Sequence, residues 1–99
     1  SKLCNTRSRQ EREHLLKEML VRINYMNEKY PQCIELLSQT RSVLKAEYCY
    51  EYCYHFRKIA QNYLRFAEVF LKLERFNESR FYCKKVYTIA KDREGLIDP

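Results

Sequence analysis

A chain of 99 residues is long enough for one domain with a modest core and leaves little room for a second. Its one glycine and two prolines exclude the closely spaced turns of an all-β chain and indicate long helices. The net charge of +6, from 19 basic and 13 acidic residues, is spread along the chain. This balance permits contact with nucleic acid or with acidic partners but demonstrates neither.

Two further features bear on the cellular setting. No run of about 18 apolar residues exists to span a membrane, and the basic start SKLCNTRSRQ is not followed by an apolar segment of signal-peptide type. The cysteines form an odd set without the short loops of a disulfide scaffold, so we expect reduced, buried thiols. They are Cys4, Cys33, Cys49, Cys53 and Cys83. We therefore expect a soluble intracellular protein, cytoplasmic or nuclear, with no membrane association.

The first helix is predicted to run from about Arg9 to Asn27. Ser8 and Glu11 have the spacing of a capping box, in which the serine caps the helix and the glutamate reaches back to it. Apolar residues then follow at helical intervals. They are Leu15, Leu16, Met19, Leu20, Ile23 and Met26.

The second helix is predicted to begin near Pro31, because proline suits the first turn of a helix. Its inward-facing residues recur at intervals of three and four. They are Cys33, Ile34, Leu37, Thr40 and Leu44. Only residues 28–30 separate this helix from the first, and so short a link predicts an antiparallel pair.

The third helix is predicted to span Ala46 to Leu73, a stretch without glycine, proline or a polar cluster. Its first part, EYCYEYCYHF, alternates as a strand does, but the helical spacing of large apolar residues continues for more than twice that length. The spaced residues are Tyr48, Tyr52, Phe56, Ile59, Tyr63, Phe66 and Phe70. Continuity along the chain therefore favours one long helix over a strand.

The fourth helix is predicted to follow Asn77, a good N-cap residue. Its expected apolar face consists of Phe81, Cys83, Val86, Tyr87, Ile89 and Ala90. Gly95 ends this helix or opens the next turn. The apolar tail 96–99 suggests that an adjoining helix follows in a longer array.

Residues 60–93 resemble a tetratricopeptide repeat, a pair of antiparallel helices whose crossing is filled by aromatic and small residues. The positions that carry the resemblance are Tyr63, Phe66, Ala67, Phe70, Phe76, Ser79, Cys83 and Val86. Ala67 and Ser79 are small enough to let the two helices approach. Glu74 and Lys91 depart from the family pattern, because they replace the usual turn glycine and closing proline.

A looser repeat covers residues 14–47. Its turn aromatic, Tyr30, precedes the equivalent Phe76 by 46 residues instead of the family's 34, so residues 48–59 are interpreted as a helix extension. The resemblance implies an all-α chain of about four helices, arranged as antiparallel pairs in a right-handed superhelix, and a scaffold that binds peptides. The clamp that some members use for chaperone carboxylates is missing. The corresponding positions hold Met19, Arg22, Leu64 and Glu68.

Catalytic and metal chemistry find little support in the sequence. Cys49 and Cys53 lie one helical turn apart, which is a weak zinc signal, and His55 points to a different face. One glycine cannot form a phosphate-binding loop, and neither histidine forms a catalytic pattern with a nucleophile. We therefore expect no enzyme activity, metal, cofactor or small-molecule substrate, with buried structural cysteines as the main interpretation.

The surplus of tyrosines suggests a binding surface on the third helix. At about 100 degrees per residue, Tyr50 and Tyr54 face away from Tyr48 and Tyr52, so this end of the helix is apolar on both sides. Tyrosine and arginine are enriched at interface hot spots. The predicted partner-binding residues are Tyr50, Tyr54, Arg57, Gln61, Arg22 and Arg65.

Three occupants of this surface stay open. The first two helices could cover the tyrosines within the chain, or the surface could bind a partner peptide or helix, or a second copy in a homo-oligomer. A protein-interaction module is the main hypothesis. The alternative is a nucleic-acid-binding helical domain, in which tyrosines stack on RNA bases and basic side chains meet phosphates.

Overall fold

A computed structural model describes the secondary structure of residues 2–46 and 52–97, and the side chains of residues 9–44 and 56–91. Within these ranges the chain consists of helices and the turns that join them, without a strand. The four helices are α1 (Lys2–Met26), α2 (Tyr30–Ala46), α3 (Tyr52–Lys72) and α4 (Phe76–Ile97). The prediction of an all-α chain with four main helices is therefore confirmed.

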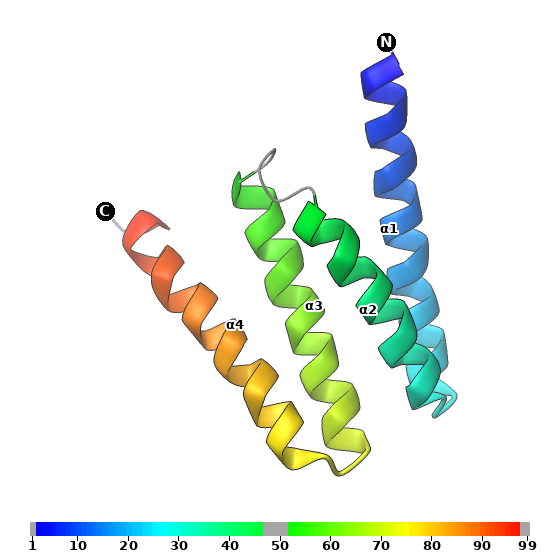
Figure 1. Ribbon diagram of the computed structural model, residues 1–99, viewed down its shortest axis with the longest axis vertical. Helices are drawn as coiled ribbons and strands as arrows, with labels where there is room; N and C mark the ends of the chain where they lie inside the picture. The colour runs from blue at the N-terminus through cyan, green and yellow to red at the C-terminus, as the bar shows by residue number, and fades with distance from the viewer. Residues whose placement is uncertain (1, 47–51, 98–99) are drawn as a thin grey trace.

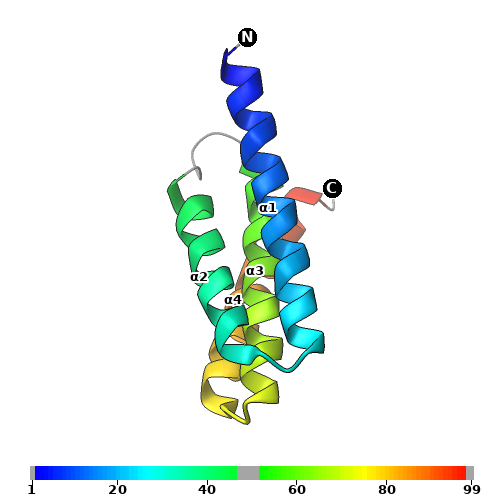
Figure 2. The same ribbon diagram turned by 90° about the vertical axis from the view of Figure 1, so that its right-hand side faces the viewer.

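The helices lie side by side in chain order, with α1 and α4 at opposite ends of the row (Figure 1). Each helix packs against its neighbours in the sequence, most extensively α3 against α4. In the view along the row, α1 lies in front and α4 behind (Figure 2). The radius of gyration of 14.6 Å exceeds the roughly 13 Å of a compact domain of this length. The arrangement is thus an open row of helices instead of a closed bundle.

Three predicted helix boundaries are wrong. α1 begins at Lys2, so Ser8 lies inside the helix and does not cap it, because nothing in residues 3–8 is a glycine or proline that would end the helical backbone. α4 begins one residue before Asn77 and continues through Gly95 to Ile97, since a single glycine is tolerated within a helix. Pro31 does lie in the first turn of α2, as predicted.

The front of the predicted third helix needs a further correction. Ala46 is the last residue of α2, and α3 begins at Tyr52. The predicted helix extension, residues 48–59, therefore lies outside the described residues up to position 51 and belongs to α3 from position 52 onward. The proposal that one helix starts at Ala46 is wrong because that residue completes the preceding helix.

The turns after α1 and α3 have the same backbone geometry. Glu28 and Glu74 adopt φ values of 61° and 60°, the left-handed conformation that usually falls to glycine. The amide of the next residue, Lys29 or Arg75, donates to the carbonyl five residues earlier at 2.8 and 2.9 Å. These are Schellman turns, which satisfy carbonyls at the helix ends, and each holds a strained glutamate in place of glycine.

The same 46-residue offset relates a hydrogen bond inside each hairpin. The Cys33 thiol donates to the Val21 carbonyl at 3.4 Å, and the Ser79 hydroxyl donates to the Ala67 carbonyl at 2.7 Å. All four residues are buried. The hairpins α1–α2 and α3–α4 therefore share their turn and one tertiary contact at equivalent positions, which we call the 46-residue shift.

The core runs through α2 and α3 and reaches the adjoining faces of α1 and α4. Its buried members are Val21, Cys33, Leu37, Phe66, Val69 and Phe70. On the α4 side the ring of Tyr82 stacks on Phe66 and Phe70, with centroid distances of 4.7 and 5.7 Å. Fully burying one such aromatic side chain stabilises a fold by about 1.5–3 kcal/mol, so this cluster is the main support of the second hairpin.

The predicted packing face of the second hairpin is partly wrong. Phe66, Ala67, Phe70 and Ser79 are buried as predicted, and Tyr63 and Val86 are half-buried. Two members are not packed: Phe76 is 56% exposed, and Cys83 is exposed. The inward residues of α4 follow a 3–4–3 spacing, which places Tyr82 at the crossing instead. They are Ser79, Tyr82, Val86 and Ile89.

Phe81, Tyr87 and Ala90, which the sequence assigned to the apolar face of the fourth helix, are exposed.

Candidate functional site

A hollow of about 310 Å³ opens between α1 and α3, with α2 beneath it. Its α1 wall includes Arg22, and its α3 wall includes Gln61 and Arg65. The floor consists of side chains that belong to or adjoin the core. They are Val21, Leu37, Thr40 and Asn62. We call this hollow the α1–α3 groove.

The groove brings together three of the six predicted partner-binding residues. Arg22 is 39 positions before Gln61 in the sequence, yet both line the same hollow together with Arg65. Arg57 is exposed one turn before Gln61 on α3 and does not line the groove. The side chains of Tyr50 and Tyr54 lie outside the described residues.

The charged side chains that line the groove differ in whether they form ion pairs. The Arg65 guanidinium pairs with Glu68, three residues on, at 3.3 Å. Across the groove, the His14 ring lies 3.1 Å from the carboxylate of Glu18 on the same helix. Arg22 is exposed and makes no ion pair with another residue whose side chain the structure describes. The groove therefore has one guanidinium without an ion pair among the described side chains and a second that is paired with a surface glutamate.

Asn62 ties the floor of the groove to α2. Its Nδ2 atom donates to the backbone carbonyl of Leu37 at 3.0 Å, and its side chain is buried. Its Oδ1 atom has no hydrogen-bond partner among the described residues. A buried acceptor left unpaired costs about 1–3 kcal/mol, so this residue fixes the register of α3 on α2 at an energetic cost.

Sequence reasoning missed a second hollow, between α3 and α4, of about 810 Å³. Phe56, Ile59 and Tyr63 line it from α3, and Phe81 and Lys85 are among the residues from α4. The Lys85 ammonium lies 5.5 Å from the Tyr63 ring centre and 4.8 Å from that of Phe81. The spacing of the three α3 residues is helical, but the sequence predicted them as core and gave no sign that the helices diverge there.

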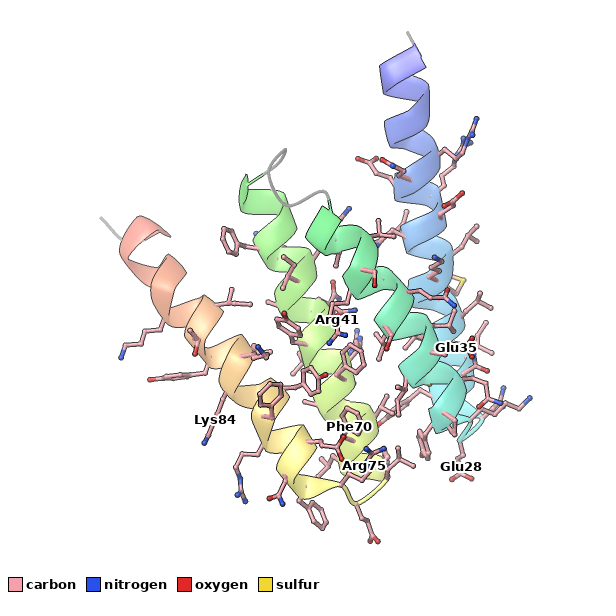
Figure 3. All side chains as sticks on the ribbon, viewed as in Figure 1. Glu28, Glu35, Arg41, Phe70, Arg75 and Lys84 are labelled. Carbon is pink, nitrogen blue, oxygen red and sulfur yellow. The ribbon has the colours of Figure 1, made fainter. Side chains whose placement is uncertain are left out.

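Arg41 connects the two hairpins. It lies on α2 facing α3 (Figure 3), with its guanidinium 5.7 Å from the ring centre of Phe66. The same side chain donates to the Tyr82 hydroxyl at 3.4 Å. A cation above an aromatic ring contributes on the order of 0.5–2 kcal/mol. No sequence signal marked this residue, because its two contacts lie 25 and 41 positions away.

Of the two cysteines whose side chains are described, Cys33 suits a structural position better than a reactive one, whereas Cys83 is exposed and does not fit the predicted buried role. Cys33 is fully buried, and burial raises the pKa of its thiol above the ordinary value, opposed in part by a backbone hydrogen bond. A thiol that resists ionisation is a poor nucleophile and metal ligand. Among the residues that the structure describes, no three histidine, cysteine or carboxylate side chains cluster to hold a metal. Cys49, Cys53 and His55 have side chains outside that set.

Comparisons of the chain with protein-family models, with curated proteins and with solved structures found no match. The tetratricopeptide resemblance and its right-handed superhelix therefore stay predictions. In the parts of the chain that the structure describes, no helix is both long and apolar enough to cross a membrane.

Proposed function

We propose that the chain is a protein-interaction module that binds a partner peptide or helix through the α1–α3 groove, with Arg22, Gln61 and Arg65 as contacts. One observation carries this proposal: residues selected from the sequence as partner contacts line one hollow from two helices far apart in the chain. An apolar floor with polar groups at its edge is the usual composition of a binding site.

The charges of the groove favour a partner with acidic residues. Two arginines and one glutamate line the hollow, and the glutamate lies against His14. Exposed ion pairs contribute only about 0–1 kcal/mol each, so the arginines orient the partner and speed association more than they add affinity. Affinity then comes from apolar side chains that enter the hollow beside Leu15 and Met19.

The scaffold interpretation also draws support from the repeated hairpin. The 46-residue shift relates the turns and one buried hydrogen bond of the two hairpins. Repeated helical hairpins build extended surfaces from which side chains of several helices reach one ligand. This is the architecture in which a binding residue on α1 and another on α3 act together.

A selection experiment tests the groove directly. A phage-displayed library of random peptides is selected on the wild-type chain, and the enriched peptides are measured against two variants. The groove variant carries Arg22→Ala, Gln61→Ala and Arg65→Ala. The control variant carries Arg9→Ala, Gln32→Ala and Arg80→Ala, which removes the same residue types from exposed positions outside the groove.

We expect enriched peptides to combine acidic and apolar residues, to bind the control variant like the wild type, and to bind the groove variant at least about tenfold more weakly. Equal binding to both variants, or no enrichment, contradicts the proposal. The nucleic-acid alternative is measured in parallel with a labelled single-stranded RNA. RNA binding that falls steeply with salt and drops equally in both variants would favour that alternative.

A further inference from the structure

The contact between α2 and α3 provides a reference for surfaces elsewhere in the chain. On α3 it uses Asn62, Phe66 and Val69, all buried. On α2 it uses Leu37, whose carbonyl accepts the Asn62 hydrogen bond, and Arg41, which lies over the Phe66 ring. Leu44, two turns after Leu37, is buried as well. We call these two sets the α3 half and the α2 half of the internal interface.

The 46-residue shift places an uncovered counterpart of the α3 half on α1. Asn62, Phe66 and Val69 correspond to three apolar residues of the first hairpin. These are Leu16, Leu20 and Ile23. They are 62%, 46% and 48% exposed, whereas Phe66 and Val69 are 2% and 1% exposed. α1 therefore presents to solvent the face that α3 buries against α2.

The same shift places an uncovered counterpart of the α2 half on α4. Leu37, Arg41 and Leu44 correspond to three residues of the second hairpin. These are Cys83, Tyr87 and Ala90. All three are exposed, and Tyr87 is 68% exposed. Since α1 and α4 lie at opposite ends of the row (Figures 1 and 2), one molecule cannot bring these two faces together.

We infer that the occupant of each face is a second copy of this chain: α1 of one copy packs on α4 of the next as α3 packs on α2. The contact is head to tail, with different surfaces on the two copies, so each added copy leaves one free face at either end. This inference concerns surfaces separate from the partner contacts of the α1–α3 groove and does not depend on them.

Exposure and charge support this occupant. The apolar residues of the α1 face, Leu16, Leu20 and Ile23, are 46–62% exposed, and exposed apolar residues grouped in this way commonly mark an interface. α2 and α3 run antiparallel, and the same arrangement between copies places Glu13 of α1 opposite the α4 segment between Lys84 and Lys91. That segment contains lysines and no carboxylate, so Glu13 meets opposite charge across the contact, whereas the neighbouring Arg12 and Lys17 of α1 do not.

Complementation between two variants tests the inference. Leu20→Glu introduces a charge into the α1 face, and Tyr87→Glu does so in the α4 face. Both side chains are substantially exposed, so both variants are expected to fold, which circular dichroism checks. Each variant alone loses self-association in analytical ultracentrifugation at about 0.15 M salt. Mixed in equal amounts they form a one-to-one dimer, because each retains the face that the other lacks.

Matched controls use exposed apolar residues outside the two faces. Met26 corresponds by the shift to exposed Lys72, and Phe81 to exposed Glu35. Met26→Glu and Phe81→Glu are therefore expected to associate like the wild type. A wild-type chain that stays monomeric at about 1 mM, where even a millimolar dissociation constant gives dimer, overturns the inference and leaves the faces to another partner. If the Tyr87→Glu variant still self-associates, the contact is symmetric through α1 and the inference is overturned. A mixture of the Leu20→Glu and Tyr87→Glu variants that stays monomeric overturns the inference as well.

Discussion

The two hairpins have the same backbone geometry at their turns but differ in which helices pack against them. Each turns through a left-handed glutamate and joins its helices with a side-chain hydrogen bond to a backbone carbonyl. In the second hairpin, aromatic rings fill the helix crossing, and α3 is covered on both sides by α2 and α4. In the first hairpin, α1 contacts α2 on one side and exposes its most apolar face on the other.

This difference shows that burial depends on the neighbours of a helix more than on its composition. α1 carries more large aliphatic residues than its packed face uses: among its described side chains, Val21 belongs to the buried core and Tyr25 packs partly buried against it, whereas six aliphatic residues are exposed. α3 is flanked on both sides, so Phe66, Ala67, Val69 and Phe70 are all buried, although Leu64 and Leu71 on its outer side are exposed. The largest stability effects are therefore expected in α3, and the equivalent changes in α1 should be small.

Removing Phe66 should produce the largest loss. Phe66→Ala deletes a ring that stacks on Phe70 and Tyr82, and truncating such a buried aromatic costs about 3–5 kcal/mol. Leu20→Ala, at the equivalent position of α1, should cost less than about 1 kcal/mol because Leu20 is already half exposed. Urea unfolding at low protein concentration measures both free energies.

The replacement Phe66→Leu is the control for a variant that fails to fold, since it installs the residue found at the equivalent position of α1. Its loss should fall between those of the two alanine variants. Equal losses for Phe66→Ala and Leu20→Ala would contradict the contrast between a covered and an uncovered helix.

Ser79 should show the next largest effect. Ser79→Ala removes the hydroxyl that donates to Ala67 and should reduce the free energy of unfolding by about 1 kcal/mol. Ser79→Cys, which installs the residue found at position 33 in the first hairpin, should lose less because a thiol is a weak donor that retains the contact. Thermal unfolding of the three chains gives the order. A cysteine variant less stable than the alanine variant would speak against equivalent roles of Ser79 and Cys33.

The two turns should respond to glycine with a gain in stability. Glu28→Gly and Glu74→Gly each relieve a left-handed conformation, and we expect a gain of about 0.5–1 kcal/mol per site. The sites lie in separate hairpins, so the gains should add. Alanine at the same positions retains the strain and should give no gain. The double glycine variant is measured by urea unfolding, and a loss of stability would show that the carboxylates contribute more than the strain costs.

The smallest predicted effect concerns pH. Burial raises the pKa of the Cys33 thiol in the folded chain above its ordinary value of 9.0. Well below pH 9.0 the thiol is protonated in both states, so stability does not depend on its ionisation. As the pH rises through and beyond that value, the unfolded thiol ionises first and stability falls.

The pH effect is isolated by comparison with a variant. Cys33→Ala lacks the thiol, so no thiol ionisation changes its free energy of unfolding. The difference in unfolding free energy by which this variant is less stable than the wild type should therefore shrink between about pH 8 and pH 10. Every other ionisable group is present in both chains, so its contribution cancels in the difference. A difference in unfolding free energy that stays constant over this range would mean that the folded thiol ionises as readily as the unfolded one.

Local features of the chain were predictable from the residue order. The scarcity of glycine and proline indicated helices, Pro31 marked the start of α2, and the small pair Ala67 and Ser79 located the crossing in the second hairpin. Such features are set by backbone sterics and by residue size, which act within one or two helical turns. The boundary at Ala46 was missed because residues 46–52 contain no helix-breaking residue.

Which face of a helix is buried depends on packing between residues far apart in the sequence, and a periodic pattern of apolar residues does not specify that packing. Cys83 and Tyr82 are adjacent, and both suit an apolar face, but the larger ring occupies the space between Phe66 and Phe70. Arg22 was selected from the sequence, yet its position opposite Gln61 and Arg65 depends on how α1, α2 and α3 pack. Residue order thus determined the helical class of the chain and the start of α2, because these depend on residues that are close in the sequence. Packing between helices decided which apolar faces are buried, because that depends on which helices have a neighbour on each side.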